Sequence, residues 1–413
     1  MARFIITSII FLTVLVAIDL YAFQAVRTAF KDASIRVQRI STILYWSVTA
    51  ITVLSFLMAG FINFRAWPDS IRSIIIGVIF LAFIVKLFLV FFLLLEDLSR
   101  LLRFAAAQIG SGGSDVDLSR KRFLSQVALG VSALPVFAFL HGIIVNAYNY
   151  KVWKTSINLP NLPASMDGFK IVQLSDIHSG SFGKKEPVEE AIQQINALEP
   201  DVILFTGDIV NEISTELEPF TGIFSKLKAK HGVFAVTGNH DHADYYPWNN
   251  QEERDADLAN LLRMEREMGW TVLMDENHKI ESEDGSISLI GVQNWSAKGR
   301  FKQYGDLAKA YQGAEDSDVK VLLSHDPSHW DAQVVPEYSD IDLQLSGHTH
   351  GAQFGIENKY FRWSPAQIMY EQWAGLYQKG KQYLYVNRGF GFIGYPGRVG
   401  ILPEIAEITL KKA

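Results

Sequence analysis

Histidine, aspartate and asparagine are concentrated in five short stretches in the second half of the chain, each at the end of an apolar run. The stretches read SDIH, TGDI, TGNHD, SHDP and SGHTHG. Their candidate metal ligands are Asp176, His178, Asp208, Asn239, His325, His348 and His350. Carboxylate, imidazole and amide oxygen without thiolate suit divalent Mn, Fe, Zn, Ni or Co. The five stretches together therefore predict metal-dependent chemistry.

The apolar runs before these stretches have the pattern of buried strands. FKIVQL, DVILF and VFAV are separated by VEEAIQQINALEP and FTGIFSKLKAKHG, which predict two helices. Alternating strands and helices predict a parallel, right-handed βαβαβ unit, which brings the carboxyl ends of its strands to one edge of the sheet. VKVLL and DLQLS repeat the strand pattern later. We therefore expect the five stretches to converge.

The spacing of the ligands supports one cavity. In an extended loop, Asp176 and His178 point to the same side, and so do His348 and His350. Glycines beside the ligands permit tight turns and close backbone approach: Gly207, Gly238, Gly347 and Gly351. A single D-x-H or GD pair is a common strand-end turn, whereas five stretches in this order indicate a metal centre.

The ordered stretches resemble the signature of the calcineurin-like metallophosphoesterase superfamily: D-x-H, GD, GNH[DE], a lone H, and GHxH. The resemblance covers residues 165–412, and the ending YLYVNRGFGF…PEIAEITL is similar to that of a membrane-anchored bacterial branch. It implies an α/β fold, the calcineurin-like four-layer αββα sandwich of two mixed sheets flanked by helices. It also implies two metals, one held by Asp176, His178 and His350, the other by Asn239, His325 and His348, with Asp208 as the bridge.

The resemblance further implies phosphoester hydrolysis. A pair of divalent cations acidifies a shared water, so that a metal-bridging hydroxide attacks the phosphorus of a phosphomonoester or phosphodiester. His240 would protonate the leaving oxygen or stabilise the equatorial oxygens, and Asp241 would orient the His240 ring. Asn211 stands three residues after Asp208, where purple acid phosphatases carry a tyrosine ligand. This difference argues against an Fe(III)–tyrosinate centre.

The first 150 residues are instead apolar. Four blocks, 4–26, 40–64, 74–95 and 123–147, are each long enough at about 1.5 Å per residue to cross roughly 30 Å of hydrocarbon. A signal peptide would explain only the first block. We therefore expect an all-α transmembrane bundle of four helices over residues 1–150, followed by a catalytic domain over residues 151–413.

Basic residues indicate the orientation of this bundle. Loops 27–39 and 96–122 together carry nine lysines and arginines, against two in loop 65–73. The positive-inside rule then predicts outward termini and an extracytoplasmic catalytic domain in a bacterial inner or plasma membrane. SRKRFL at 119–124 resembles a twin-arginine export signal, although a basic flank of a membrane span explains it equally well. GSGGSD at 110–115 reads as a flexible linker.

Composition and charge limit the kinds of site and binding partner that the chain can have. The chain has 413 residues, a formal net charge of −6 and no cysteine, which excludes disulfides and thiolate sites. Lysine and arginine cluster beside the apolar blocks, so no nucleic-acid partner is expected. Membrane anchoring suggests a lipid-linked or envelope-associated phosphoester substrate and contact with membrane lipids, although anchored enzymes also act on soluble nucleotides or sugar phosphates.

Two other classes of function stay open. One is a non-catalytic metal-binding signalling module. The other is a transporter with a regulatory phosphoesterase-like domain, for which Asp19, Lys86 and His141 inside the predicted spans could form an ion path. One isolated ionisable group per helix is also what polar contacts between helices and snorkelling at helix ends produce, and the sequence favours this second interpretation.

Several further residues allow two interpretations. Segment 354–385 is rich in aromatics that form either an amphipathic lip at the bilayer or an aromatic core: Tyr360, Phe361, Trp363, Tyr370, Trp373 and Tyr377. Arg388 would approach phosphate or support a loop. His242 would touch substrate or lie in a surface turn, and the sequence favours the turn. His231, His278 and His329 are interpreted as scaffold.

Overall fold

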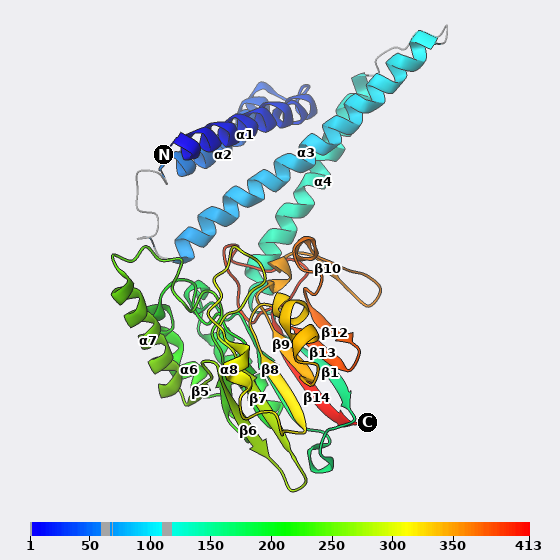
Figure 1. The fold of residues 1–413 in the computed structure, drawn as a ribbon. Coiled ribbons are helices and arrows are strands. Elements are labelled where there is room, and N and C mark those ends of the chain that lie inside the picture. Colours follow the sequence, from blue (N-terminus) through cyan, green and yellow to red (C-terminus); the bar gives the residue numbers. More distant parts are fainter. Residues whose placement is uncertain (1, 59–66, 68, 110–117) are drawn as a thin grey trace. The chain divides into compact units, whose positions relative to one another are not determined.

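The computed structural model describes residues 2–58, 67, 69–109 and 118–413, and it divides into two compact units, Met1–His141 and Gly142–Ala413. The first unit holds four helices: α1 (Ala2–Ala29), α2 (Ile35–Met58), α3 (Asp69–Ile109) and α4 (Leu118–Ile144) (Figure 1). Each contains a window long and apolar enough to cross a membrane: Leu12–Ala29, Ile35–Ser55, Ile75–Leu102 and Ser125–Ile144. The prediction of four apolar helices is confirmed. The GSGGSD linker and residues 59–64 of the second block lie outside the described residues.

The third helix is longer than predicted. α3 continues from the expected end at residue 95 to Ile109. The added residues are mainly Leu, Ala, Arg and Phe, with no glycine or proline before Gly110, so nothing in the sequence stops the helix earlier. α4 in turn begins at Leu118 and includes the SRKRFL stretch. The expected loop 96–122 is therefore helical at both ends.

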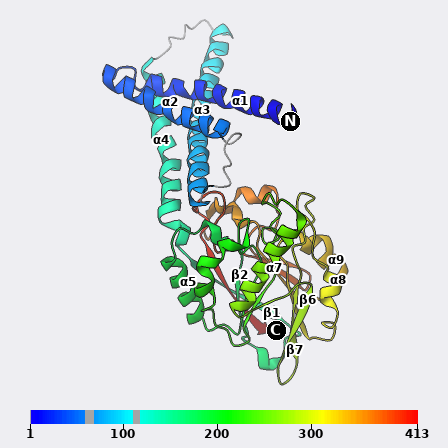
Figure 2. The same ribbon diagram turned by 90° about the vertical axis from the view of Figure 1, so that its left-hand side faces the viewer.

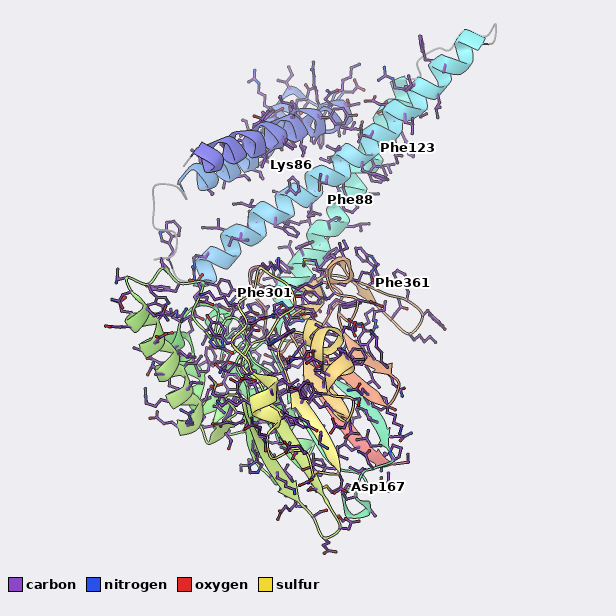
Figure 3. The ribbon with its side chains drawn as sticks, in the orientation of Figure 1. Lys86, Phe88, Phe123, Asp167, Phe301 and Phe361 are labelled. Atoms are coloured by element: carbon purple, nitrogen blue, oxygen red, sulfur yellow. The ribbon has the colours of Figure 1, made fainter. Side chains whose placement is uncertain are left out.

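Two of the three ionisable residues in the spans pair with each other. Lys86 Nζ on α3 lies 2.6 Å from Asp19 Oδ1 on α1 and donates a hydrogen bond of 3.1 Å to Thr49 Oγ1 on α2 (Lys86 is labelled in Figure 3). Both charges are buried, whereas His141 is exposed on α4. A buried charge in an apolar bundle needs a partner. We therefore interpret the Asp19–Lys86 pair as a contact that joins three helices.

The second unit contains two mixed six-stranded sheets. The first has the order β1 (Lys151–Leu159), β14 (Glu404–Lys412), β2 (Lys170–Leu174), β3 (Val202–Phe205), β4 (Val233–Ala235) and β5 (Trp270–Val272). The second has the order β12 (Gly375–Lys379), β13 (Gln382–Val386), β9 (Leu343–Ser346), β8 (Val319–Leu323), β7 (Ser286–Gly291) and β6 (Glu276–Glu281). Strands β2, β3 and β4 are parallel, as are β8 and β9, so the five predicted strands are confirmed.

Helices cover the outer faces of both sheets. α5 (Glu186–Ala197), α6 (Thr221–Phe224) and α7 (Gln251–Glu267) pack on the first sheet, and α8 (Leu307–Tyr311) and α9 (Val335–Glu337) on the second. Figure 2 shows α5 on one side of the strands and α8 and α9 on the other. The inner faces meet in one core, where Leu204 and Phe234 pack with Val321 and Leu345. The predicted four-layer αββα sandwich is confirmed.

One predicted helix is wrong in extent. The structure reduces the helix expected over residues 220–232 to α6, which has four residues. Gly222 weakens the helix, and Lys226, Lys228 and Lys230 alternate with apolar residues at a spacing that does not fit one helical face. The backbone instead makes single turns, with Leu227 N donating to Phe224 O at 3.2 Å.

Buried hydrogen bonds tie the two sheets together at the carboxyl ends of their strands. The side-chain amide of Gln173 on β2 donates to Ser346 O on β9 at 2.9 Å, and Ser346 Oγ donates to Ser324 O beyond β8 at 2.6 Å. Asn387, just after β13, donates to Gln173 O at 3.2 Å. A buried polar group is costly unless it is paired, so these bonds specify how the sheets meet. They bring the predicted ligand stretches of both sheets to one edge.

Candidate metal centre

A first group of ligands joins the end of β2 to the end of β9. Nε2 of His350 lies 3.1 Å from Asp176 Oδ1 and 3.0 Å from His178 Nε2. All three side chains are buried, and their ligand atoms lie within 4.8 Å of one another. These are the three residues that the resemblance assigns to one metal.

A second group joins the end of β3 to the ends of β8 and β9. Nε2 of His325 lies 2.9 Å from Asp208 Oδ2 and 3.2 Å from His348 Nδ1. The ligand atoms of Asp208, His325 and His348 also lie within 4.8 Å of one another. The same Asp208 Oδ2 is 3.8 Å from His178 Nε2 of the first group. One carboxylate is therefore within reach of both groups, as a bridging ligand must be.

Asn239 presents an unpaired oxygen. Its side-chain Nδ2 donates to Tyr245 OH at 2.8 Å, whereas its Oδ1 is buried and makes no hydrogen bond within the described part of the chain. An unpaired buried oxygen is costly in a folded protein. A divalent cation would satisfy this oxygen, so Asn239 fits the ligand role that the resemblance implies.

Backbone carbonyls fix the orientation of two ligand rings. His178 Nδ1 lies 3.1 Å from Val210 O, and His325 Nδ1 lies 2.7 Å from Thr206 O. A carbonyl only accepts, so the ring proton is on Nδ1 and the Nε2 lone pair points toward the other ligands. This arrangement of converging lone pairs and carboxylates fits two divalent cations.

Most of the ligands have unusual backbone conformations. The φ angles of Asp176, His178, Asp208, His348 and His350 lie between 48° and 70°. This left-handed region costs a non-glycine residue about 1–2 kcal/mol, and such strain is found mainly at functional sites. The expectation of extended loops is therefore wrong, although its result holds, because Asp176 and His178 still point into one group.

The structure gives Asp241 different contacts from those the resemblance implies. Its carboxylate accepts hydrogen bonds from the backbone N–H groups of Asp208 (2.7 Å), Gly238 (2.7 Å) and Ile209 (2.8 Å). His240 Nδ1 instead lies 2.5 Å from Asn211 O, and the His240 N–H donates to Asp208 Oδ1 at 2.8 Å. Asp241 therefore fixes the loop that carries Asp208, and the carbonyl of Asn211 orients the His240 ring.

Burial and the mutual charges of the ligands shift their pKa values. Burial would raise the pKa of Asp208, but the charges of His325 and His240 hold it well below its usual range. Burial would lower the pKa of His325, but the Asp208 charge raises it to about 10. Burial also lowers the pKa of His348 and His178. The raised pKa means that, without metal, His325 also holds a proton on Nε2, which faces Asp208. A bound cation would displace this proton and use the Nε2 lone pair.

The sequence interpretation missed three residues around this centre. Asp326 Oδ2 lies 3.6 Å from His348 Nε2 and accepts a hydrogen bond from Tyr370 OH at 3.1 Å, so it places a carboxylate beside the His348 ring. Tyr245 lies against His240, with ring centres 4.5 Å apart. Arg398 Nη2 is 3.3 Å from His350 Nδ1. Of these three residues, the sequence pointed only to Asp326, because it directly follows His325 in the stretch SHDP.

Two residues with open interpretations are now placed. His242 is buried, with its ring stacked 3.8 Å from that of Tyr304 and its pKa lowered to about 4 by burial, so the surface-turn prediction is wrong. Arg388 is buried and forms ion pairs with Glu357 (2.6 Å) and Glu404 (2.8 Å), which supports its structural interpretation.

Comparisons with known proteins agree with this geometry. A family model described as "Calcineurin-like phosphoesterase" matches residues 169–352, and one described as "Probable Calcineurin-like phosphoesterase, transmembrane domain" matches residues 2–147. A "Transmembrane protein with metallophosphoesterase domain" from Danio rerio is 31% identical over 311 residues, which cover 72% of this chain and 67% of that protein. The "Uncharacterized metallophosphoesterase YkuE" from Bacillus subtilis is 30% identical over 302 residues, which cover 71% of this chain and 98% of that protein.

Gly238 provides a test of the centre in which no ligand residue is itself substituted. A Cβ at this position would collide with Asp208 Oδ1, whereas a Cβ at Gly183 meets no atom within 4 Å. We expect Gly238→Ala to displace the Asp208 carboxylate and to weaken metal binding by about 10-fold or more, with Gly183→Ala unchanged. Titration of the metal-free full-length protein with Mn(II) measures this. Equal affinities for the two variants would contradict the central placement of Asp208.

Proposed function

Because the chain belongs to the calcineurin-like metallophosphoesterase family, we propose that it is a membrane-bound hydrolase of phosphomonoesters or phosphodiesters. The observation that carries this proposal is the position of Asp208. Its Oδ2 is near ligands of both metal groups, and its Oδ1 accepts a hydrogen bond from the backbone N–H of His240. Ligands for two cations and a candidate acid are thus held by one carboxylate.

The metal ions and His240 have different roles in the proposed hydrolysis. Two divalent cations, when bound, supply an activated water and neutralise the charge that develops on the phosphoryl oxygens. His240 supplies the proton for the leaving oxygen. The Asn211 carbonyl, 2.5 Å from His240 Nδ1, accepts a hydrogen bond from Nδ1–H, so Nε2 of the protonated ring is the atom that can give its proton to the leaving oxygen. Asp241 contributes indirectly, because it fixes the backbone of the Asp208 loop.

Aromatic and basic residues flank the second ligand group. The Phe301 ring lies 4.7 Å from that of His348, and the Tyr370 ring lies 5.5 Å from it. The Lys298 ammonium lies 5.3 Å from the Tyr370 ring, and the Arg300 guanidinium lies 4.5 Å from the Phe301 ring. Exposed cations beside an apolar rim suit an anionic phosphoester with an apolar portion. This supports a lipid-linked or envelope-associated substrate.

The chain is a membrane protein. We propose that its second unit, Gly142–Ala413, which we call the catalytic unit, lies outside the cytoplasm of a bacterial cell. The support is the distribution of basic residues around the four helices, which favours loops 27–39 and 96–122 on the cytoplasmic side. The substrate would then be a phosphoester on the outer side of the inner or plasma membrane.

Hydrolysis of p-nitrophenyl phosphate and its bis ester tests catalysis. The full-length protein, loaded with Mn(II), should hydrolyse at least one ester, and His240→Ala should lower kcat by about 100-fold or more while metal content stays unchanged. His231→Ala is the matched control, because the ring of this histidine packs on that of Phe169, with ring centres 5.8 Å apart, and His231 belongs to neither ligand group. Absence of turnover by the loaded native protein on any phosphoester would favour the non-catalytic signalling module.

Fusion reporters after Ala413 test the orientation. Positive-inside orientation predicts that a reporter active only in the cytoplasm stays silent, and that one active only outside the cytoplasm is active. The opposite pattern would place the catalytic unit in the cytoplasm and would exclude an outer substrate.

A further inference from the structure

An exposed apolar segment follows the metal loop. We call residues 356–369 the apolar lip. It contains the two-stranded hairpin of β10 (Ile356–Glu357) and β11 (Arg362–Trp363). Five of its large apolar residues have more than half of their surface exposed to solvent: Tyr360 84%, Ile368 82%, Ile356 54%, Phe361 53% and Met369 52%. Several large apolar side chains exposed within one short segment are typical of an interaction surface.

The base of the lip is firmly held, so its exposed side chains are presented by an ordered support. Glu357 on β10 pairs with Arg388. Arg362 on β11 donates to Ala374 O at 2.7 Å, and Ser364 Oγ donates to Gly351 O at 2.7 Å. The aromatic residues that follow the lip, Tyr370 and Trp373, are buried. Segment 354–385 thus combines both predicted roles, an exposed lip and an aromatic core.

Hydrogen bonds join the start of the lip to the end of a membrane-spanning helix. Gly355 N donates to Val399 O at 2.9 Å, and Val399 N donates to Gln353 O at 2.8 Å. The preceding residue, Arg398, donates its backbone N–H to Gly142 O at 3.1 Å. Gly142 lies in the last turn of α4, whose candidate span ends at Ile144. The segment that contains Arg398 and Val399 therefore connects the start of the lip to the end of the apolar span.

We propose that the apolar lip inserts into the headgroup region of the lipid bilayer in which the chain is anchored. Its composition fits that region, where tyrosine, phenylalanine and aliphatic side chains are buried and lysine reaches the polar surface. The Lys359 ammonium lies 4.5 Å from the Tyr360 ring, as expected for such a pair at an interface. The link through Val399 and Arg398 to the end of α4 would keep the lip close to this surface.

Insertion would place the metal centre at the membrane surface. Ser364 in the lip bonds to Gly351, the neighbour of the ligand His350, and the Tyr370 ring just beyond the lip lies 5.5 Å from that of His348. Figure 3 shows Phe361 and Phe301 at one end of the catalytic unit and Asp167 at the opposite end. The surface that bears the lip is thus the one that bears the centre.

Site-specific fluorophores test the lip directly, because the chain has no native cysteine. Phe361→Cys and Ile368→Cys, each labelled with an environment-sensitive nitrobenzoxadiazole, are compared in full-length protein in phosphatidylcholine nanodiscs. The matched control is Glu283→Cys, an exposed residue in the β6–β7 turn, at the opposite end of the catalytic unit from β10 (Figure 1). Doxyl-labelled lipid quenches from within the bilayer, and iodide quenches from water.

We expect both lip labels to lose about half of their emission to doxyl-labelled lipid and to resist iodide, as for groups buried about 5–10 Å into the interface. The Glu283 label should show the reverse. Lip labels that respond like the control would overturn the proposal. Protection from both quenchers would also overturn it, because a second copy of the chain or another protein would then cover the lip. The readout needs no turnover, so it is independent of the proposed hydrolysis.

Discussion

The whole site depends on the electrostatic attraction between the Asp208 carboxylate and histidines that belong to the opposite sheet. Asp208 follows β3 of the first sheet, whereas its partner His325 follows β8 of the second. The first ligand group also crosses between sheets, since Asp176 and His178 pair with His350. Neither group can form unless the two sheets pack at their carboxyl ends, so folding of the sandwich and assembly of the metal centre are one process.

The surrounding structure compensates for the cost of this convergence. Left-handed backbone at five ligands and close packing at Gly238 are maintained by short hydrogen bonds, among them those from the Asp208 loop to Asp241. Charge-assisted bonds of this kind are roughly twice as strong as neutral ones. The same end of the catalytic unit carries the apolar lip and the bonds to the last turn of α4. The metal centre is thus close to the surface that we propose contacts the membrane.

The sequence predicted the strands, their polar ends and the candidate ligands because apolar runs and residue chemistry are local. It could not predict contacts that only the packed sheets create. The burial of His242 against Tyr304 and the approach of Asp326 to His348 join segments far apart in sequence. The contacts of Asp241 and the left-handed ligand backbone depend on loop geometry, which a two-residue spacing does not specify. The extent of α3 was missed because apolarity ends before helix propensity does.

Metal content per chain tests the central role of Asp208 most directly. Full-length protein loaded with Mn(II) and freed of excess metal should retain two ions per chain, one for each ligand group. Asp208→Asn should lose most of both, because each group loses its shared carboxylate, whereas Asp284→Asn at a distant exposed position should retain two. Retention of two ions by Asp208→Asn, or of only one by the native protein, would contradict the account.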